Sequence, residues 1–263
     1  MRFYDAHNHL QDERFTNREA LVETAGREGV ARMVVNGSCE EDWPVVRDLA
    51  RMFPQVLPSF GYHPWYFHER TPQWQQKLVE FLDTRHAAVG EIGLDRWKPD
   101  LPYDGQEDAF TCQLRLAAER NLPVSIHCLQ AWGRLHELLR DTPRPARGFL
   151  LHSYGGSTEM VEPLAKLGAY FSFPGYFMHA RKARQREAFQ AAPLDRVLIE
   201  TDAPDQLLPD SANRFPLRDG ASKPINHPAN LGAVYEFVAR ERALPLEAFA
   251  TQIEENFLRL FGS

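Results

Sequence analysis

Short apolar runs alternate with longer stretches of helical periodicity along the whole chain. A short apolar run bounded by turn residues is typical of a buried strand, and apolar residues spaced three and four apart are typical of a helix. The apolar runs predict strands at residues 2–6, 31–36, 56–60, 88–91, 124–126, 149–151, 169–173 and 197–199. Strands that alternate with helices form a parallel sheet, and eight such units make up a TIM barrel. The pattern therefore predicts the α/β class and, within it, a (β/α)₈ barrel.

The segments between these runs predict the helices. They cover residues 17–28, 42–52, 72–83, 105–120, 130–140, 158–167 and 179–190. Asn17 is a suitable N-cap for the first helix, and Gly29, Gly168 and the step at residues 122–123 are typical helix stops. Two further helices, at 228–242 and 246–261, are expected to complete the outer layer.

One long irregular segment interrupts the pattern after the eighth strand. Residues 203–228 contain Pro204, Pro209, Pro216 and Pro224, and a loop of this length in a compact domain is usually functional. No internal repeat or flexible linker divides the chain. Residues 1–263 are therefore expected to form a single barrel domain.

The charge balance bears on possible partners. The chain has 30 Lys and Arg against 36 Asp and Glu, a formal net charge of −6. This balance argues against a protein that holds nucleic acid on a broad basic surface, because such binding depends on cations that displace counterions. It does not exclude a nuclease whose positive charge is supplied by bound metal ions.

The cysteines and the N-terminal residues indicate a cellular compartment. Only Cys39, Cys112 and Cys128 are present, at spacings that fit neither a disulfide framework nor a thiolate zinc site. The chain shows neither a signal peptide nor an apolar stretch long enough to span a membrane. These features predict a cytoplasmic protein without a membrane partner, and the sequence leaves the oligomeric state undetermined.

The candidate chemistry lies where the apolar runs end. His7 and His9 are two apart on the first strand, so their side chains point the same way and can hold one ion. Further residues of ligand type follow other runs: His63, Glu91, His127, His152 and Asp202. In a barrel these positions converge on the C-terminal rim. Imidazole and carboxylate groups bind zinc, manganese and similar divalent ions, so the pattern predicts a metal centre there.

Six motifs, in the order DAHNHL, GYHP, GEIGLD, PVSIHC, LHSYGG and LIETDAP, resemble those of the TatD family of metal-dependent hydrolases, and EENFLRLF resembles the closing segment of that family. The resemblance implies a TatD-like (β/α)₈ barrel of the amidohydrolase superfamily, several of whose TatD members are metal-dependent DNases. It also implies a set of metal ligands, namely His7, His9, Glu91, His127, His152 and Asp202.

The expected chemistry uses two divalent ions, zinc, magnesium or manganese. Glu91 is the natural bridging ligand, because a carboxylate offers two oxygens to two ions. Two such ions can activate a water molecule and stabilise both the attacking and the leaving oxygen of a phosphodiester. Asp202 is the candidate general base for that water. Glu91 and Asp202 are therefore the predicted catalytic residues.

Several other residues are candidates for substrate binding or for orienting ligands. His63 lies among aromatic residues, and we expect it to contact substrate beside Tyr62 and Trp65, whose rings offer faces to nucleobases. In the basic segment HARKARQR, Lys182 is the best candidate for a phosphate contact, although such a segment is more often a solvated face. Asp95 and Glu200 are expected to orient metal ligands.

Together these features predict a metal-dependent hydrolase that cleaves phosphodiester bonds, a deoxyribonuclease acting on the ends of single-stranded DNA. Two alternatives remain open at this point. The same centre polarises the carbonyl of an ester or amide, as in a D-aminoacyl-tRNA deacylase. The chain is also compatible with a metal-binding partner protein that has no turnover.

Overall fold

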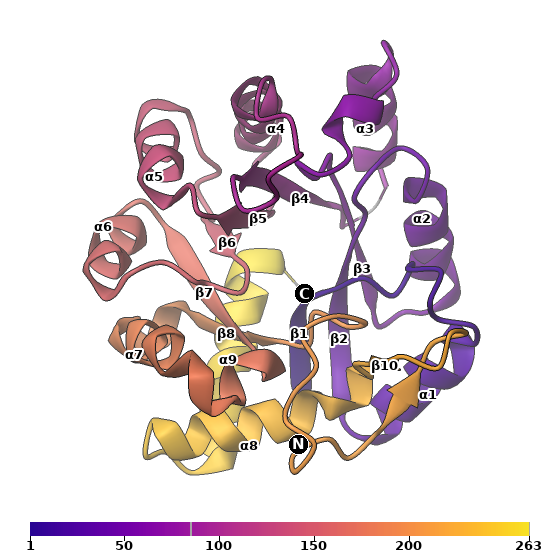
Figure 1. Cartoon of the computed structure of the whole chain (residues 1–263), viewed down its shortest axis with the longest axis vertical. Helices are drawn as coiled ribbons and strands as arrows, with labels where there is room; N and C mark the ends of the chain where they lie inside the picture. Colours follow the sequence, from indigo (N-terminus) through magenta and orange to yellow (C-terminus); the bar gives the residue numbers. More distant parts are fainter. Residues whose placement is uncertain (85, 263) are drawn as a thin grey trace.

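Eight parallel strands surround one axis in the computed structural model, which describes residues 1–84 and 86–262 (Figure 1). The strands are β1 Phe3–Asn8, β2 Val30–Asn36, β3 Val56–Phe60, β4 Ala88–Asp95, β5 Val124–Leu129, β6 Phe149–Leu151, β7 Ala169–Pro174 and β8 Val197–Glu200. They are hydrogen-bonded in sequence order from β1 to β8, and each neighbouring pair is parallel. The predicted (β/α)₈ barrel is confirmed.

The barrel is closed beside the C-terminal ends of β1 and β8. The backbone N–H of Asp202 donates to the carbonyl of His7 at 2.9 Å, and the N–H of His9 donates to the carbonyl of Ala203 at 2.7 Å. The buried Asp5 carboxylate adds a third link by accepting from the backbone N–H of Thr201 at 2.9 Å. The first and last strands are thus joined at the level where the predicted metal ligands lie.

Helices form the outer layer, as the periodicity predicts. Their bounds are α1 Arg18–Arg27, α2 Trp43–Met52, α3 Trp74–Leu82, α4 Gln106–Arg120, α5 Trp132–Asp141, α6 Val161–Lys166, α7 Ala183–Ala191, α8 Leu231–Glu241 and α9 Leu246–Phe261. The predicted cap of α1 is confirmed, because the Asn17 side chain accepts a hydrogen bond from the N–H of Ala20. None of the described helices combines the length and apolar character that a membrane span requires.

Three predicted helices begin later than expected, after a 3₁₀ turn. These turns are Thr158–Met160, Ala180–Lys182 and Pro228–Asn230. In the first case the cause is Pro163, which has no N–H to donate to the carbonyl four residues earlier, so regular α-helix can only begin at Val161. The long segment 203–228 is also less irregular than predicted, because it contains a short antiparallel pair, β9 Leu217–Arg218 and β10 Pro224–Ile225.

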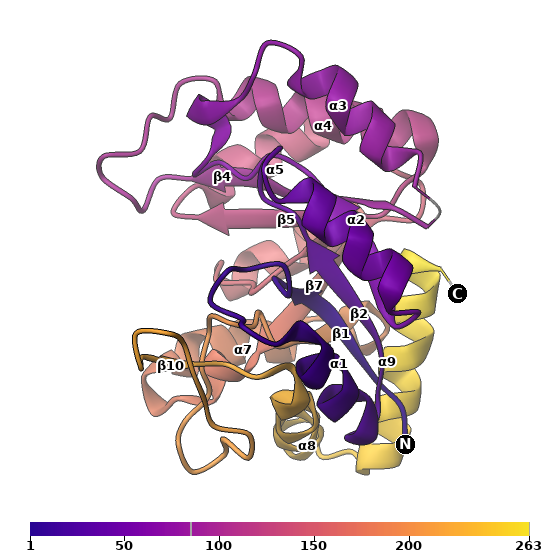
Figure 2. The same ribbon diagram turned by 90° about the vertical axis from the view of Figure 1, so that its right-hand side faces the viewer.

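The loops and the last helix lie at opposite ends of the barrel. In Figure 2 the loop after β4 and the segment around β10 project from the same side of the sheet, whereas α9 lies on the other side. Asn256 of α9 donates hydrogen bonds to the carbonyls of Leu194 and Val197, each at 2.8 Å, and so attaches this helix to the start of β8. The end that carries the loops is therefore left for binding and chemistry.

Candidate metal centre

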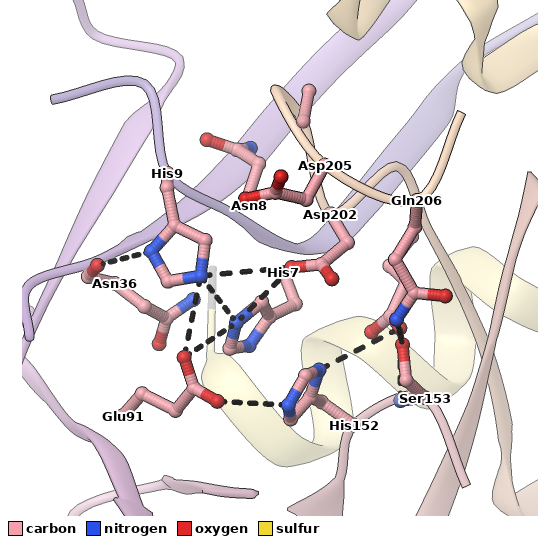
Figure 3. Close-up of polar contacts among 12 residues, drawn as sticks. His7, Asn8, His9, Asn36, Glu91, His152, Ser153, Asp202, Asp205 and Gln206 are labelled. Carbon is pink, nitrogen blue, oxygen red and sulfur yellow. Dashed lines mark hydrogen bonds and ion pairs between the residues drawn. The ribbon is translucent and has the colours of Figure 1, made fainter. Parts of the chain in front are cut away.

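The six predicted metal ligands converge at the C-terminal ends of the strands, and Figure 3 shows five of them, all except His127. His7 lies in β1, Glu91 in β4 and His127 in β5. His9 and His152 directly follow β1 and β6, and Asp202 lies two residues after the end of β8. Strands β4 and β5 run further than predicted, to Asp95 and Leu129, so His127 lies within a strand rather than after it, and Glu91 lies in the middle of its strand rather than at the end. The extension arises because inward-facing ligands continue the period-two alternation of a buried strand. All six side chains are buried except that of His9, which is partly exposed.

Each oxygen of the Glu91 carboxylate faces a separate pair of imidazoles. Oε2 lies 3.3 Å from Nε2 of His7 and 3.2 Å from Nε2 of His9. Oε1 lies 2.8 Å from Nε2 of His152 and 3.0 Å from Nδ1 of His127. One carboxylate thus joins two groups of donor atoms, which is the arrangement expected of a bridging ligand.

Asp202 adds a second carboxylate to one of the two groups. Its Oδ1 lies 3.7 Å from Nε2 of His7 and 3.5 Å from Nε2 of His9. The ligand atoms of these three residues all lie within 4.8 Å of one another. The donor group on the β1 and β8 side therefore contains two imidazoles and two carboxylates, counting Glu91.

The outer nitrogens of His7 and His9 are held by protein oxygens. Nδ1 of His9 lies 2.9 Å from the backbone carbonyl of Asn36, which can only accept, so this nitrogen carries the proton. Nδ1 of His7 lies 2.7 Å from the hydroxyl of Ser125. Sequence reasoning did not find Ser125, although its position two residues before His127 on the same strand was a usable signal. Both rings are fixed with Nε2 directed at the carboxylates.

Two acidic residues lie at the outer nitrogens of the other pair of imidazoles, and Asp95 holds its histidine by a hydrogen bond, as predicted. Oδ2 of Asp95 lies 2.9 Å from Nε2 of His127, which leaves Nδ1 of that ring free to face Glu91. Oε1 of Glu200 lies 3.8 Å from Nδ1 of His152, too far for a hydrogen bond, so Glu200 acts on that ring through its charge alone. A carboxylate that is hydrogen-bonded to a ligating histidine, as Asp95 is, sets the tautomer of the ring and raises its basicity.

The donor set fits cations. Nε2 of His7 lies 3.3 Å from Nε2 of His9, and Nδ1 of His127 lies 3.3 Å from Nε2 of His152. Where outer nitrogens carry the protons, the inner nitrogens present lone pairs, and two facing lone pairs repel unless a proton or a cation lies between them. Imidazole nitrogens with carboxylate oxygens are ligands that zinc and manganese accept.

The ionisation of the site depends on burial and on these contacts. Burial, with repulsion from His152, lowers the pKa of His7 to about 3. At His9 burial opposes protonation, but contacts with Glu91 and Asp202 outweigh it and raise the pKa to about 9. Burial raises the pKa of Asp202 to about 7. An arriving cation must therefore displace protons at neutral pH, so binding is expected to weaken as the pH falls.

His63 lies at the rim with the other candidates, as predicted, and directly contacts Glu91. Its Nε2 is 3.4 Å from Oε1 of Glu91, and His63, Glu91 and His127 form a further group of potential ligands. Its Nδ1 accepts a hydrogen bond from the backbone N–H of Trp65 at 3.1 Å, so a neutral ring carries its proton on Nε2. Burial lowers the pKa of His63 to about 4 and keeps the ring neutral.

Tyr62 is a core residue, contrary to the prediction that it binds substrate. The side chain is only 3% exposed, and its ring packs against Trp43, Phe67 and Trp74. The hydroxyl donates to the carboxylate of Glu40 at 3.0 Å. The ring therefore offers no free face to a nucleobase. The physical reason is that the turn after β3 directs Tyr62 into the helical layer and His63 into the centre.

Of the two other predicted substrate contacts, Trp65 lies beside the metal centre and Lys182 lies on an aromatic ring after β7. Trp65 is partly exposed, and its indole N–H donates to Oδ2 of Asp95 at 2.7 Å, which places it beside His127. Lys182 ends a 3₁₀ turn after β7, and its ammonium lies 4.6 Å from the centre of the Tyr176 ring. The structure thus joins Trp65 to the centre, whereas Lys182 packs on a neighbouring ring.

Asp95→Asn is expected to lower metal affinity by about 10- to 100-fold, because outer partners of ligating histidines have effects of this size. The amide keeps the shape of the side chain but removes the negative charge. That charge holds the proton of His127 on Nε2 and so leaves the lone pair of Nδ1 directed at the centre. The measurement is metal content after dialysis at graded concentrations of free metal. Asp108→Asn, on the outer helix α4, is the control. Equal affinity in Asp95→Asn and wild type would contradict this role.

The barrel and its two donor groups define the class of metal-dependent hydrolases, whose sites lie at the C-terminal ends of barrel strands. The family model of TatD-related DNases matches residues 4–262, and the chain belongs to this family.

Similar proteins include nucleases and hydrolases. The chain is 32% identical over 255 residues to the 3'-5' ssDNA/RNA exonuclease TatD of Escherichia fergusonii, covering 94% of this chain and 93% of that protein. It is 30% identical to the uncharacterized metal-dependent hydrolase YabD of Bacillus subtilis, covering 98% of both. The crystal structure of YjjV, a TatD homologue from Escherichia coli, superposes with a TM-score of 0.89 at 27% identity and covers 99% of this chain and 98% of that one.

Proposed function

We propose that this protein is a two-metal nuclease that removes nucleotides from the ends of single-stranded DNA. The observation that carries the proposal is the Glu91 carboxylate, whose two oxygens face two separate donor groups. His7, His9 and Asp202 would hold one divalent ion with Glu91, and His127 and His152 would hold the other. The similarity to a relative named as a single-stranded DNA and RNA exonuclease supports phosphodiesters as the substrate class.

Two bound ions supply charge stabilisation for the attacking and leaving oxygens of a phosphodiester. The protein residues position and move protons around them. Asp202 is the proposed proton acceptor for the attacking water, because its contacts with His7 and His9 are made by Oδ1, which leaves Oδ2 to accept a proton. Both oxygens of Glu91 face imidazoles, so its proposed role is to fix the position of the two donor groups relative to each other.

His63 is proposed to donate a hydrogen bond to the substrate rather than to ligate an ion. A ligand nitrogen needs a lone pair, whereas Nε2 of the neutral His63 ring carries the proton. That N–H is directed at Glu91, at the edge of the centre where a phosphodiester oxygen would arrive. Trp65 is the proposed stacking surface for a base, and Lys182 is proposed to contact phosphate further along the strand.

The test is hydrolysis of a labelled single-stranded oligonucleotide by purified protein with Mg²⁺, Mn²⁺ or Zn²⁺. We expect progressive shortening, slower cleavage of the matching duplex, and loss of activity with a chelator. Charged tRNA carrying a D-amino acid is assayed in parallel. An intact oligonucleotide under every metal would overturn the proposal, and release of the amino acid instead would assign a deacylase.

A further inference from the structure

The loop after β4 exposes an aromatic side chain beside the metal centre. Among the described residues, the exposed large aromatic side chains are Trp97, at 56%, and Tyr66, at 37%. A tryptophan that remains in water adds little to the hydrophobic core, so its exposure on a loop at the reactive end of a barrel points to binding. In Figure 2 this loop projects from the side of the barrel opposite α9.

The Asp95 carboxylate fixes this loop relative to the centre. Its Oδ1 accepts hydrogen bonds from the backbone N–H groups of Trp97, at 2.7 Å, and Lys98, at 3.3 Å. Its Oδ2 lies 2.7 Å from the indole nitrogen of Trp65 and 2.9 Å from Nε2 of His127. One side chain therefore holds the start of the loop, a second tryptophan and a candidate metal ligand together.

The same loop carries positive charge close to aromatic faces. The ammonium of Lys98 lies 4.4 Å from the centre of the Trp65 ring, and the guanidinium of Arg96 lies 4.1 Å from the centre of the Tyr103 ring. The loop also carries Asp100 and Asp104, but it is the two cations that lie against aromatic faces. Aromatic faces interleaved with cations are what single-stranded nucleic acid binds, with bases stacked on rings and phosphates on cations.

We infer that Trp97 and Lys98 form a subsite for the nucleotide that adjoins the cleaved one. The indole of Trp97 stacks on the base, and Lys98 contacts the following phosphate from its position over Trp65. This inference rests on the proposed nuclease function. It adds the residues that hold the single-stranded DNA next to the site of cleavage. Because every base has a flat face, the subsite is tolerant of sequence and requires an unpaired strand.

The test compares variants on two substrates with the metal-loaded enzyme. Trp97→Ala is expected to raise KM for a single-stranded oligonucleotide about 10-fold, since stacking of one base is worth about that much on alanine substitution. Lys98→Ala is expected to raise KM about threefold and to weaken its dependence on salt. Neither variant should change hydrolysis of bis(p-nitrophenyl) phosphate, which has no neighbouring nucleotide. Trp97→Phe should restore most of the affinity.

Two exposed residues on other parts of the barrel provide matched controls. Met52 ends α2, and Lys166 ends α6 and pairs with Glu162. Met52→Ala and Lys166→Ala should leave both substrates unaffected. Binding is also measured without turnover, as quenching of tryptophan fluorescence by a phosphorothioate oligonucleotide. That quenching should fall markedly in Trp97→Phe, even though affinity is retained.

The outcomes separate the subsite from the nuclease activity. Unchanged KM and quenching in Trp97→Ala, with normal cleavage by wild type, would overturn the subsite and leave the nuclease proposal standing. Equal losses on both substrates would also overturn it, because Trp97 would then act through the centre. If wild type binds the oligonucleotide through Trp97 but cleaves no phosphodiester, the proposed function falls, and with it the assignment of Trp97 to the nucleotide beside the cleaved one; only the binding of an unpaired strand by Trp97 then stands. Absence of both binding and cleavage overturns both.

Discussion

Glu91→Gln is expected to reduce hydrolysis of single-stranded DNA by about 1,000-fold or more, because losing an ion or its correct position removes most of the charge stabilisation of the reaction. Glutamine has nearly the same shape as glutamate. It presents one neutral oxygen and one amide NH₂, however, so one of the two imidazole pairs would face a donor in place of an acceptor. The variant is therefore expected to lose one ion outright and to hold the other less tightly.

Three measurements follow this variant: turnover of the oligonucleotide, metal content of the purified protein, and thermal stability with and without added metal. Ions that bind only the folded protein raise its melting temperature, so wild type should be stabilised by metal and Glu91→Gln much less. Glu162→Gln, on the exposed face of α6, is the matched control. Full metal content together with full activity in Glu91→Gln would show that the carboxylate does not join the two groups.

The order and type of elements could be predicted from the sequence because the barrel strands are buried on both faces over most of their length. A strand covered by helices has a continuous apolar sequence. An example is β6, whose observed bounds, 149–151, are those predicted. The ends of β4 and β5 could not be predicted this way. Polar residues such as Glu91 and His127 interrupt the apolar run, although the backbone continues in the sheet beyond them.

The convergence of the candidate ligands could be predicted because the barrel brings distant strand ends together, whereas the choice of six among them came from the resemblance to the TatD family. Histidines and carboxylates that follow separate apolar runs must meet at one rim, whatever the loops do. The surroundings of these ligands were less predictable. Tyr62 and His63 are adjacent in sequence, yet one enters the helical layer and the other the centre. The exposure of Trp97 depends on how Asp95 folds the following loop, which has no periodic signal.

Gly93→Ala is expected to destabilise the protein by about 3 kcal/mol or more and to displace the metal centre. Gly93 pairs with His127 across β4 and β5. A β-carbon added at Gly93 would lie 1.9 Å from the backbone carbonyl oxygen of His127, and the φ of +151° at Gly93 is one that other residues rarely adopt. Because the obstacle is backbone, it can move only if β5 moves and carries His127 with it.

The measurements are urea unfolding and metal content of whatever variant protein remains folded. Gly133→Ala in α5 is the matched control, since the added β-carbon would meet no heavy atom within 4 Å apart from its chain neighbours and the adjoining backbone of its own helix. It should be neutral or more stable than wild type by up to about 1 kcal/mol, as alanine favours helix. A Gly93→Ala protein with the stability and metal content of Gly133→Ala would mean that β4 and β5 can separate without disturbing His127. The close backbone contact would then have no part in positioning the centre.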